Sequence, residues 1–173
     1  MEENFKVTKD ILASSGQRFS NYLIDRIIFT GVFFAFGIVA AAYAEITGND
    51  EILNFLERLD NINRFLDMLI TGFVFGVFYT ILEFKTQRTI GKYITKTMVV
   101  LENGEKPDLN TIITRSLCRI IPFDALSYLG STTRGWHDSL SNTYVVNVEK
   151  FYNKIEAIED FKDLGKSEED IVF

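Results

Sequence analysis

Two uncharged apolar blocks constrain the fold of this chain more than any other feature of its sequence. Residues 27–44 and residues 68–82 contain no Asp, Glu, Lys or Arg. A helix needs about 20 mostly apolar residues to cross the hydrocarbon core of a bilayer, and fewer where polar residues anchor its ends. We therefore predict two transmembrane helices, at about residues 20–44 and 66–84. The first block has no polar face at helical spacing, which argues against the alternative of a soluble helical bundle.

A cleaved signal peptide is a second alternative for the first block, because Ala42-Tyr43-Ala44 resembles a cleavage triplet. The block begins late in the chain, is long for a signal peptide, and carries Asp25 close to its start. We therefore expect an uncleaved span.

The composition excludes several classes of function. The chain has 173 residues and a net charge of −6, and it shows no basic stripe with interleaved aromatic residues, which argues against nucleic-acid binding. Its single cysteine, Cys118, allows no intrachain disulfide. With His137 as the single histidine, no zinc or other metal site and no cofactor is expected.

The charges that flank the two blocks predict the orientation of the protein, because Lys and Arg gather on the cytoplasmic side of bacterial membranes. The segment between the spans is acidic, and the segments outside them are basic. We expect both termini in the cytoplasm of a bacterial inner (cytoplasmic) membrane, and a short amphipathic helix between the spans on the outside. The basic flanking residues are Lys6, Lys9, Arg18, Lys85, Arg88, Lys92 and Lys96, and the acids between the spans are Glu45, Asp50, Glu51, Glu57, Asp60 and Asp67.

The first span carries charges at its start, where hydrocarbon would exclude them. Arg18 and Asp25 are two helical turns apart and therefore lie on one face. In the expected topology these residues and Arg26 share a depth with Glu83 at the end of the second span. An unpaired charge near hydrocarbon costs about 2.5–3.5 kcal/mol even on the mildest scale. We therefore expect opposite charges to converge at this level, including a direct pair between Arg18 and Asp25.

The second half of the chain predicts a small cytoplasmic sheet. Thr97–Leu101 and the similar string 143–146 are rich in β-branched residues, and we expect the two strands to pair. Asn103-Gly104 is suited to a type I′ turn, in which both central residues have positive φ.

Between the two strands, Asp108 or Asn110 can cap a helix over residues 111–121 that ends at Pro122. This helix is too short to span, and we expect it to be interfacial or re-entrant, with Arg115 and Arg119 reaching headgroups or the acids of the inner face. Residues 123–129 continue as an aromatic, embedded hairpin. The acidic tail, residues 149–173, predicts an exposed amphipathic helix with a frayed end.

These segments together resemble the RDD family of bacterial membrane proteins, over about residues 15–148. Arg18-Phe19 and Leu23-Ile24-Asp25 are similar to the opening of that family, with Arg18 as its arginine and Asp25 as its first aspartate. Gly135-Trp136-His137-Asp138 followed by Thr143-Tyr144-Val145-Val146 is similar to the closing block, with Asp138 as the second aspartate. The resemblance implies three regions: a cytoplasmic segment (1–17), a membrane domain (18–148) and an acidic tail (149–173). Many members carry a third long apolar segment, where this chain has only residues 120–130, interrupted by Pro122 and Asp124.

The resemblance implies transport, including cation/proton exchange, as one function. Carboxylates at low dielectric could alternate between a proton and a cation. Two spans are too few to line a path, so transport would require a homo-oligomer. Small residues in both spans allow close helix approach, either between copies or within one chain; they are Gly31, Ala35, Gly72 and Gly76.

The alternative is a non-catalytic scaffold or an accessory subunit of a larger membrane complex. In that interpretation a structural ion-pair network joins the helix ends to the sheet. No nucleophile motif or phosphate-binding loop accompanies His137-Asp138, so we expect no enzymatic activity. The candidate site residues under both interpretations are Arg18, Asp25, Glu83, Arg115, Arg119 and Asp138.

Overall fold

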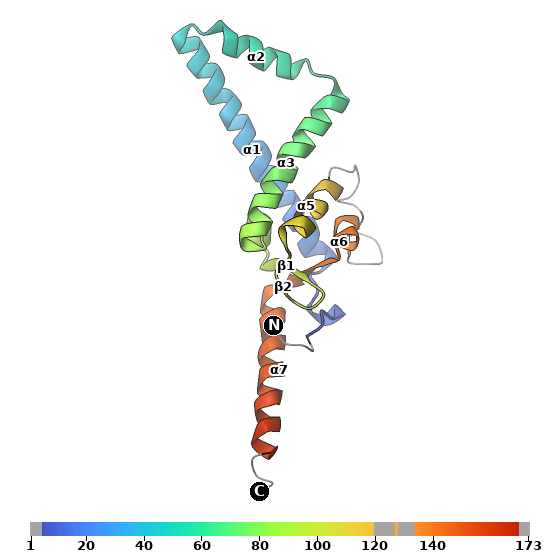
Figure 1. Ribbon diagram of the computed structural model, residues 1–173. Coiled ribbons are helices and arrows are strands. Elements are labelled where there is room, and N and C mark those ends of the chain that lie inside the picture. Colours follow the sequence, from blue (N-terminus) through green and yellow to red (C-terminus); the bar gives the residue numbers. More distant parts are fainter. Residues whose placement is uncertain (1–4, 120–126, 128–133, 170–173) are drawn as a thin grey trace.

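The protein is mostly helical, with two long apolar helices and a two-stranded sheet (Figure 1). The computed structural model describes residues 5–119, residue 127 and residues 134–169. In chain order the elements are η1 (Lys9–Ile11), α1 (Ser15–Thr47), α2 (Asp50–Asp60), α3 (Arg64–Thr86), α4 (Ile90–Ile94), β1 (Thr97–Leu101), α5 (Leu109–Cys118), α6 (Trp136–Leu140), β2 (Thr143–Asn147) and α7 (Val148–Glu169).

Helices α1 and α3 cover the two predicted spans, and both are long and apolar enough to cross a membrane. Only 11% of the most apolar stretch of each helix is buried within the protein, whereas the core helix of a soluble protein would be mostly buried. At a rise of 1.5 Å per residue, α3 is about 35 Å long and α1 about 50 Å. Because a hydrocarbon core is about 30 Å thick, α1 is long enough to leave its first turns outside it.

The ends of both helices follow from local sequence. Ser14 and Gln17 form a capping box at the start of α1, in which each side chain bonds the backbone N–H of the other. Gly48 ends the helix in the left-handed region, at φ +64°. Asn63 caps α3 by accepting the N–H of Phe65, and Gln87 ends it at φ +59°.

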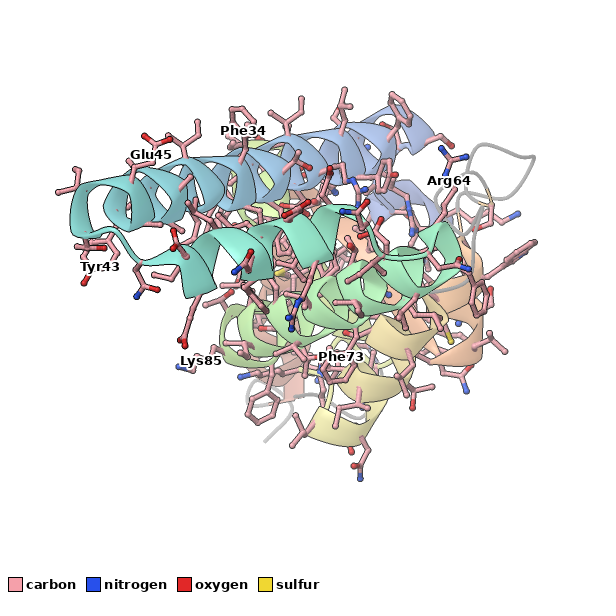
Figure 2. The ribbon with its side chains drawn as sticks, turned by 90° about the horizontal axis from the view of Figure 1, so that it is seen from above. Phe34, Tyr43, Glu45, Arg64, Phe73 and Lys85 are labelled. Carbon is pink, nitrogen blue, oxygen red and sulfur yellow. The ribbon has the colours of Figure 1, made fainter. Side chains whose placement is uncertain are left out.

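Helices α1, α2 and α3 form a triangle in Figure 1, with α2 joining the ends at which the two long helices diverge. Below that opening the long helices meet through aromatic side chains, and the ring centroids of Phe29 and Phe75 lie 3.6 Å apart. The outer faces remain apolar and exposed, and Figure 2 shows Phe34 pointing away from α3. Phe34 is 70% exposed. The predicted amphipathic helix between the spans is confirmed as α2, in which no residue is buried.

The predicted pairing of the two strands is confirmed. β1 and β2 are antiparallel, with Val99 opposite Val145. The N-terminal segment extends this sheet, because Ala13 donates its N–H to the carbonyl oxygen of Val145 (2.9 Å).

The predicted type I′ turn at residues 103–104 is wrong, since Gly104 has a positive φ (+79°) and Asn103 does not. The N–H of Gly104 donates to the carbonyl oxygen of Leu101, and the N–H of Leu101 to that of Glu105 (both 2.9 Å), a pattern typical of a type I turn followed by a glycine bulge. The strand that pairs with β1 is β2, which follows α5 and α6 in the chain.

A small core lies between the sheet, the N-terminal segment and the first turns of α7. Its buried residues are Phe5, Val7, Ile11, Met98, Val100, Val146 and Phe151. The predicted helix in the tail is confirmed as α7, which projects away from this core (Figure 1), with Phe161 76% exposed.

Helix α5 starts and ends earlier than predicted, at Leu109–Cys118, and it is capped by Asp108, which accepts the N–H of Thr111 (3.0 Å). The predicted hairpin at 123–129 and the apolar segment 120–130 lie outside the described residues, apart from Ser127.

Candidate functional site

A cluster of charged side chains lies where α1, α3, α4, α5 and α6 converge. We call it the charge cluster, and its members are Arg18, Glu83, Lys92, Arg115, Arg119 and Asp138. All but Arg119 are buried, each being at most 6% exposed. Charges so deeply buried are stable only when paired and hydrogen-bonded.

Glu83 lies at the end of α3 and receives three cations. Lys92 Nζ and Arg119 Nη2 lie 2.8 Å from its Oε1, and Arg115 Nε lies 3.0 Å from its Oε2. These partners come from α4 and from α5 with its C-terminal cap. Because Glu83 belongs to α3, its carboxylate attaches this long helix to both short ones.

Asp138 forms the second centre of the cluster. It pairs with Arg18 of α1 and with Arg115 of α5, and it accepts the N–H of Gly135 at the start of α6 (3.0 Å). Burial alone would raise the pKa of Asp138, but the guanidinium of Arg115, the ring of His137 and the guanidinium of Arg18 hold that pKa well below its ordinary value. Asp138 is therefore an ionised counter-ion.

Arg115 links the two acids. Its Nε donates to Glu83, and its Nη1 donates both to Asp138 and to the hydroxyl of Thr143 on β2 (2.6 Å). A planar guanidinium presents several donors in fixed directions, which a lysine cannot do. Through this one side chain, α3, α5, α6 and the sheet are connected.

Asp25 is engaged outside the charge cluster. Its carboxylate accepts the hydroxyl of Thr89 (2.6 Å) and the backbone N–H of Gly91 (2.7 Å) in the segment that forms α4. The predicted direct pair between Arg18 and Asp25 is wrong, because Arg18 reaches Asp138 instead. Arg18, Asn21 and Asp25 do share one buried face of α1, as their spacing predicted.

The close approach of α1 and α4 requires the glycine at position 91. A Cβ built there would lie 2.5 Å from the carbonyl oxygen of Asn21 and 3.0 Å from Asp25. The side-chain amide of Asn21 lies between the hydroxyls of Thr95 and Thr97. Uncharged hydrogen bonds thus continue the contact from α4 into β1.

Cations outnumber acids in the charge cluster, four to two. Burial lowers the pKa of Lys92 from 10.5 to about 8, although Glu83 opposes that shift. In the part of the chain that the structure describes, no three His, Cys, Asp or Glu side chains are grouped to hold a metal ion. The arrangement can neutralise its own acids, and it offers no ready set of free carboxylates to a cation.

The structure brings together five of the six predicted site residues. The sixth, Asp25 of α1, lies beside them and accepts hydrogen bonds from Thr89 and Gly91. The small residues lie elsewhere. A Cβ on Gly31 would meet nothing within 4 Å, and Ala35 is exposed. A Cβ on Gly76 would lie 3.8 Å from the carbonyl oxygen of Ser116 on α5, and Gly72 is half-buried. Close packing of Gly31 or Gly76 between α1 and α3 is therefore not seen.

Sequence reasoning missed Lys92, Thr89 and Gly91 as members of the site. The available signal was a helix cap: Thr89 precedes α4, and its hydroxyl accepts the N–H of Lys92. A five-residue helix that starts there places Gly91 against α1 and Lys92 toward Glu83. Nothing in the sequence alone indicated those two partners.

No curated protein and no solved structure matches this chain. A family model does match, over residues 12–148, and it includes α1, α3, the sheet and all members of the charge cluster. The family, together with the two long apolar helices, indicates a membrane protein. The chain belongs to the RDD family.

Proposed function

We propose that the chain is a non-catalytic integral membrane module, in which the charge cluster is a structural joint between two transmembrane helices and the sheet. The observation that carries this proposal is that each acid at the joint already has partners within the protein. Glu83 receives three cations, Asp138 receives two, and Asp25 accepts two hydrogen bonds from α4. Such a module would act as a scaffold or as an accessory subunit of a larger membrane complex.

Insertion in a bacterial inner membrane, with both termini cytoplasmic, is part of this proposal. The basic residues before α1 and after α3 lie on the side of the sheet. The segment that contains α2, in which six acids outnumber Arg58 and Arg64, lies at the other end. This distribution follows the excess of Lys and Arg on the cytoplasmic side. It supports a two-span topology with α2 on the outer surface.

A flux measurement separates a scaffold from an exchanger. The purified protein is reconstituted in liposomes that contain a pH-sensitive dye, and Na⁺ or K⁺ gradients are imposed. A scaffold gives no proton flux above that of empty liposomes, in a sample whose folding and orientation are verified. Flux that follows the cation gradient would overturn the structural proposal.

Transport as a homo-oligomer is the second candidate, and one observation favours it. Lys92 is buried against Glu83, next to the end of α3, and its pKa of about 8 lets it lose a proton near physiological pH. Proton loss there would leave Glu83 with Arg115 and Arg119. If the liposomes do show flux, Lys92→Met should abolish its pH dependence, whereas the exposed Lys150→Met should not.

A further inference from the structure

Arg26 lies near the start of the membrane-spanning part of α1 and, like Asp25, is not a member of the charge cluster. Its neighbour Asp25 is turned toward Thr89 and Gly91. Arg26 is exposed, and no carboxylate of the described residues lies within ion-pair distance of it. Its guanidinium carbon stands 4.7 Å from the ring centre of Phe75 on α3. A positive charge therefore lies against the ring of Phe75, and its guanidinium donates no hydrogen bond to any residue that the structure describes.

The same guanidinium lines a cavity between α1 and α3. The cavity measures about 240 Å³, and its lining residues are Arg26, Phe29, Thr30, Phe33, Ile70, Thr71, Val74 and Phe75. Sites that enclose a whole drug-sized ligand measure about 300–1,000 Å³. This cavity is smaller and almost wholly apolar beyond Arg26 and two threonines, so it suits part of a hydrocarbon chain.

We propose that this cavity binds an anionic phospholipid from the leaflet on the side of the charge cluster. The lipid phosphate accepts hydrogen bonds from Arg26, and one acyl chain lies along Phe33, Ile70 and Val74. A guanidinium presents paired donors that match phosphate oxygens, and basic pockets between transmembrane helices bind anionic headgroups. The inference rests on the proposed insertion of α1 and α3 in a bilayer.

Charge complementarity selects this occupant over the alternatives. A zwitterionic lipid would place its own cation close to Arg26. A second copy of the chain that packed through the same face would bring another Arg26, a like charge, against the first. The lipid supplies both a phosphate for the guanidinium and a hydrocarbon chain for the cavity.

The test uses the full-length protein in mixed micelles that contain equal amounts of phosphatidylglycerol and phosphatidylcholine with identical acyl chains. Native mass spectrometry measures the ratio of the two lipids retained by the protein. We expect phosphatidylglycerol to exceed phosphatidylcholine, Arg26→Gln to lower this ratio about fivefold, and Arg26→Lys to retain most of it. Thr71→Phe, which fills the cavity, should reduce the retention of both lipids.

Arg88→Gln is the matched control, because Arg88 also stacks on an aromatic ring, at 5.4 Å from Tyr93, but lies outside the cavity. An equal fall in the ratio for Arg88→Gln would indicate general surface charge and overturn the proposal. Equal retention of phosphatidylglycerol and phosphatidylcholine by the wild-type protein would also overturn it. That result does not depend on the folding of any variant. Displacement of phosphatidylglycerol from the protein by soluble glycerol phosphate alone would also overturn the proposal, because the site would then bind a free phosphate group rather than a lipid.

Membrane insertion is measured separately by alkaline extraction of membranes from expressing cells. Release of the wild-type protein would refute the proposed membrane module itself. Retention of the protein without lipid selectivity would refute the lipid site alone.

Discussion

At the scale of single residues, the acids of the charge cluster depend on their partners. Asp138→Asn removes the shared counter-ion of Arg18 and Arg115, both of which are buried. Breaking a buried pair on one side costs about 3–5 kcal/mol, since a charge is left uncompensated. We expect a loss of that size in the free energy of unfolding, measured by denaturant titration in detergent. Asp160→Asn, at an exposed position of α7, should change stability little.

Lys92 predicts a dependence of stability on pH whose sign follows from its lowered pKa. Its folded-state pKa is about 8 and its ordinary value is 10.5. Between these values the unfolded chain binds more protons than the folded protein, so stability from this residue rises as pH increases from about 8 to about 10.5. Below pH 8 this residue destabilises the folded state by a constant amount.

The measurement is the thermal midpoint of the wild type minus that of Lys92→Met, across this pH range. The difference isolates Lys92 from the other lysines and tyrosines that titrate there. It should shift in favour of the wild type as pH rises. A flat difference would show that Lys92 keeps its proton while buried.

At the scale of elements, the contact between α1 and α4 depends on the absence of a side chain at position 91. Gly91→Ala would place a Cβ 2.5 Å from the backbone of Asn21, and the backbone cannot yield as a flexible side chain could. We expect α4 to be displaced, with loss of the Asp25 hydrogen bonds and a clear fall in thermal stability. Gly37→Ala is the matched control, because a Cβ there meets nothing within 4 Å. That substitution should leave stability unchanged or slightly raised, since alanine favours helix.

The elements were predictable where one local signal decides them. The two long segments without charged residues predicted α1 and α3, and the two strings of β-branched residues predicted that β1 and β2 pair. The partners inside the charge cluster were not predictable in the same way. Arg18 could pair with Asp25 on its own helix face, yet it reaches Asp138, and Asp25 accepts hydrogen bonds from Thr89 and Gly91. Such a choice depends on how α4 and α6 dock, and sequence spacing does not encode that.

At the scale of the whole molecule, the two long helices are attached to the sheet side more firmly than to each other. α1 is bonded to α4 and α6, and α3 to α4 and α5, through the charge cluster and Asp25. Toward α2 the long helices diverge (Figure 1). A joint at one end and an opening toward the other is consistent with a bilayer in which lipid covers the apolar faces.

Topology is the prediction that tests this arrangement as a whole. Asn54 lies on α2 and Asn103 in the turn after β1, so they are at opposite ends of the long helices, and both are exposed. In a Cys118→Ser background, Asn54→Cys should react with a membrane-impermeant maleimide in intact cells. Asn103→Cys should react only after the membrane is opened, because the proposed orientation, based on the basic flanks, puts the sheet in the cytoplasm. Labelling of both cysteines from outside would exclude the two-span topology, and labelling of Asn103→Cys alone would reverse the orientation while keeping both spans.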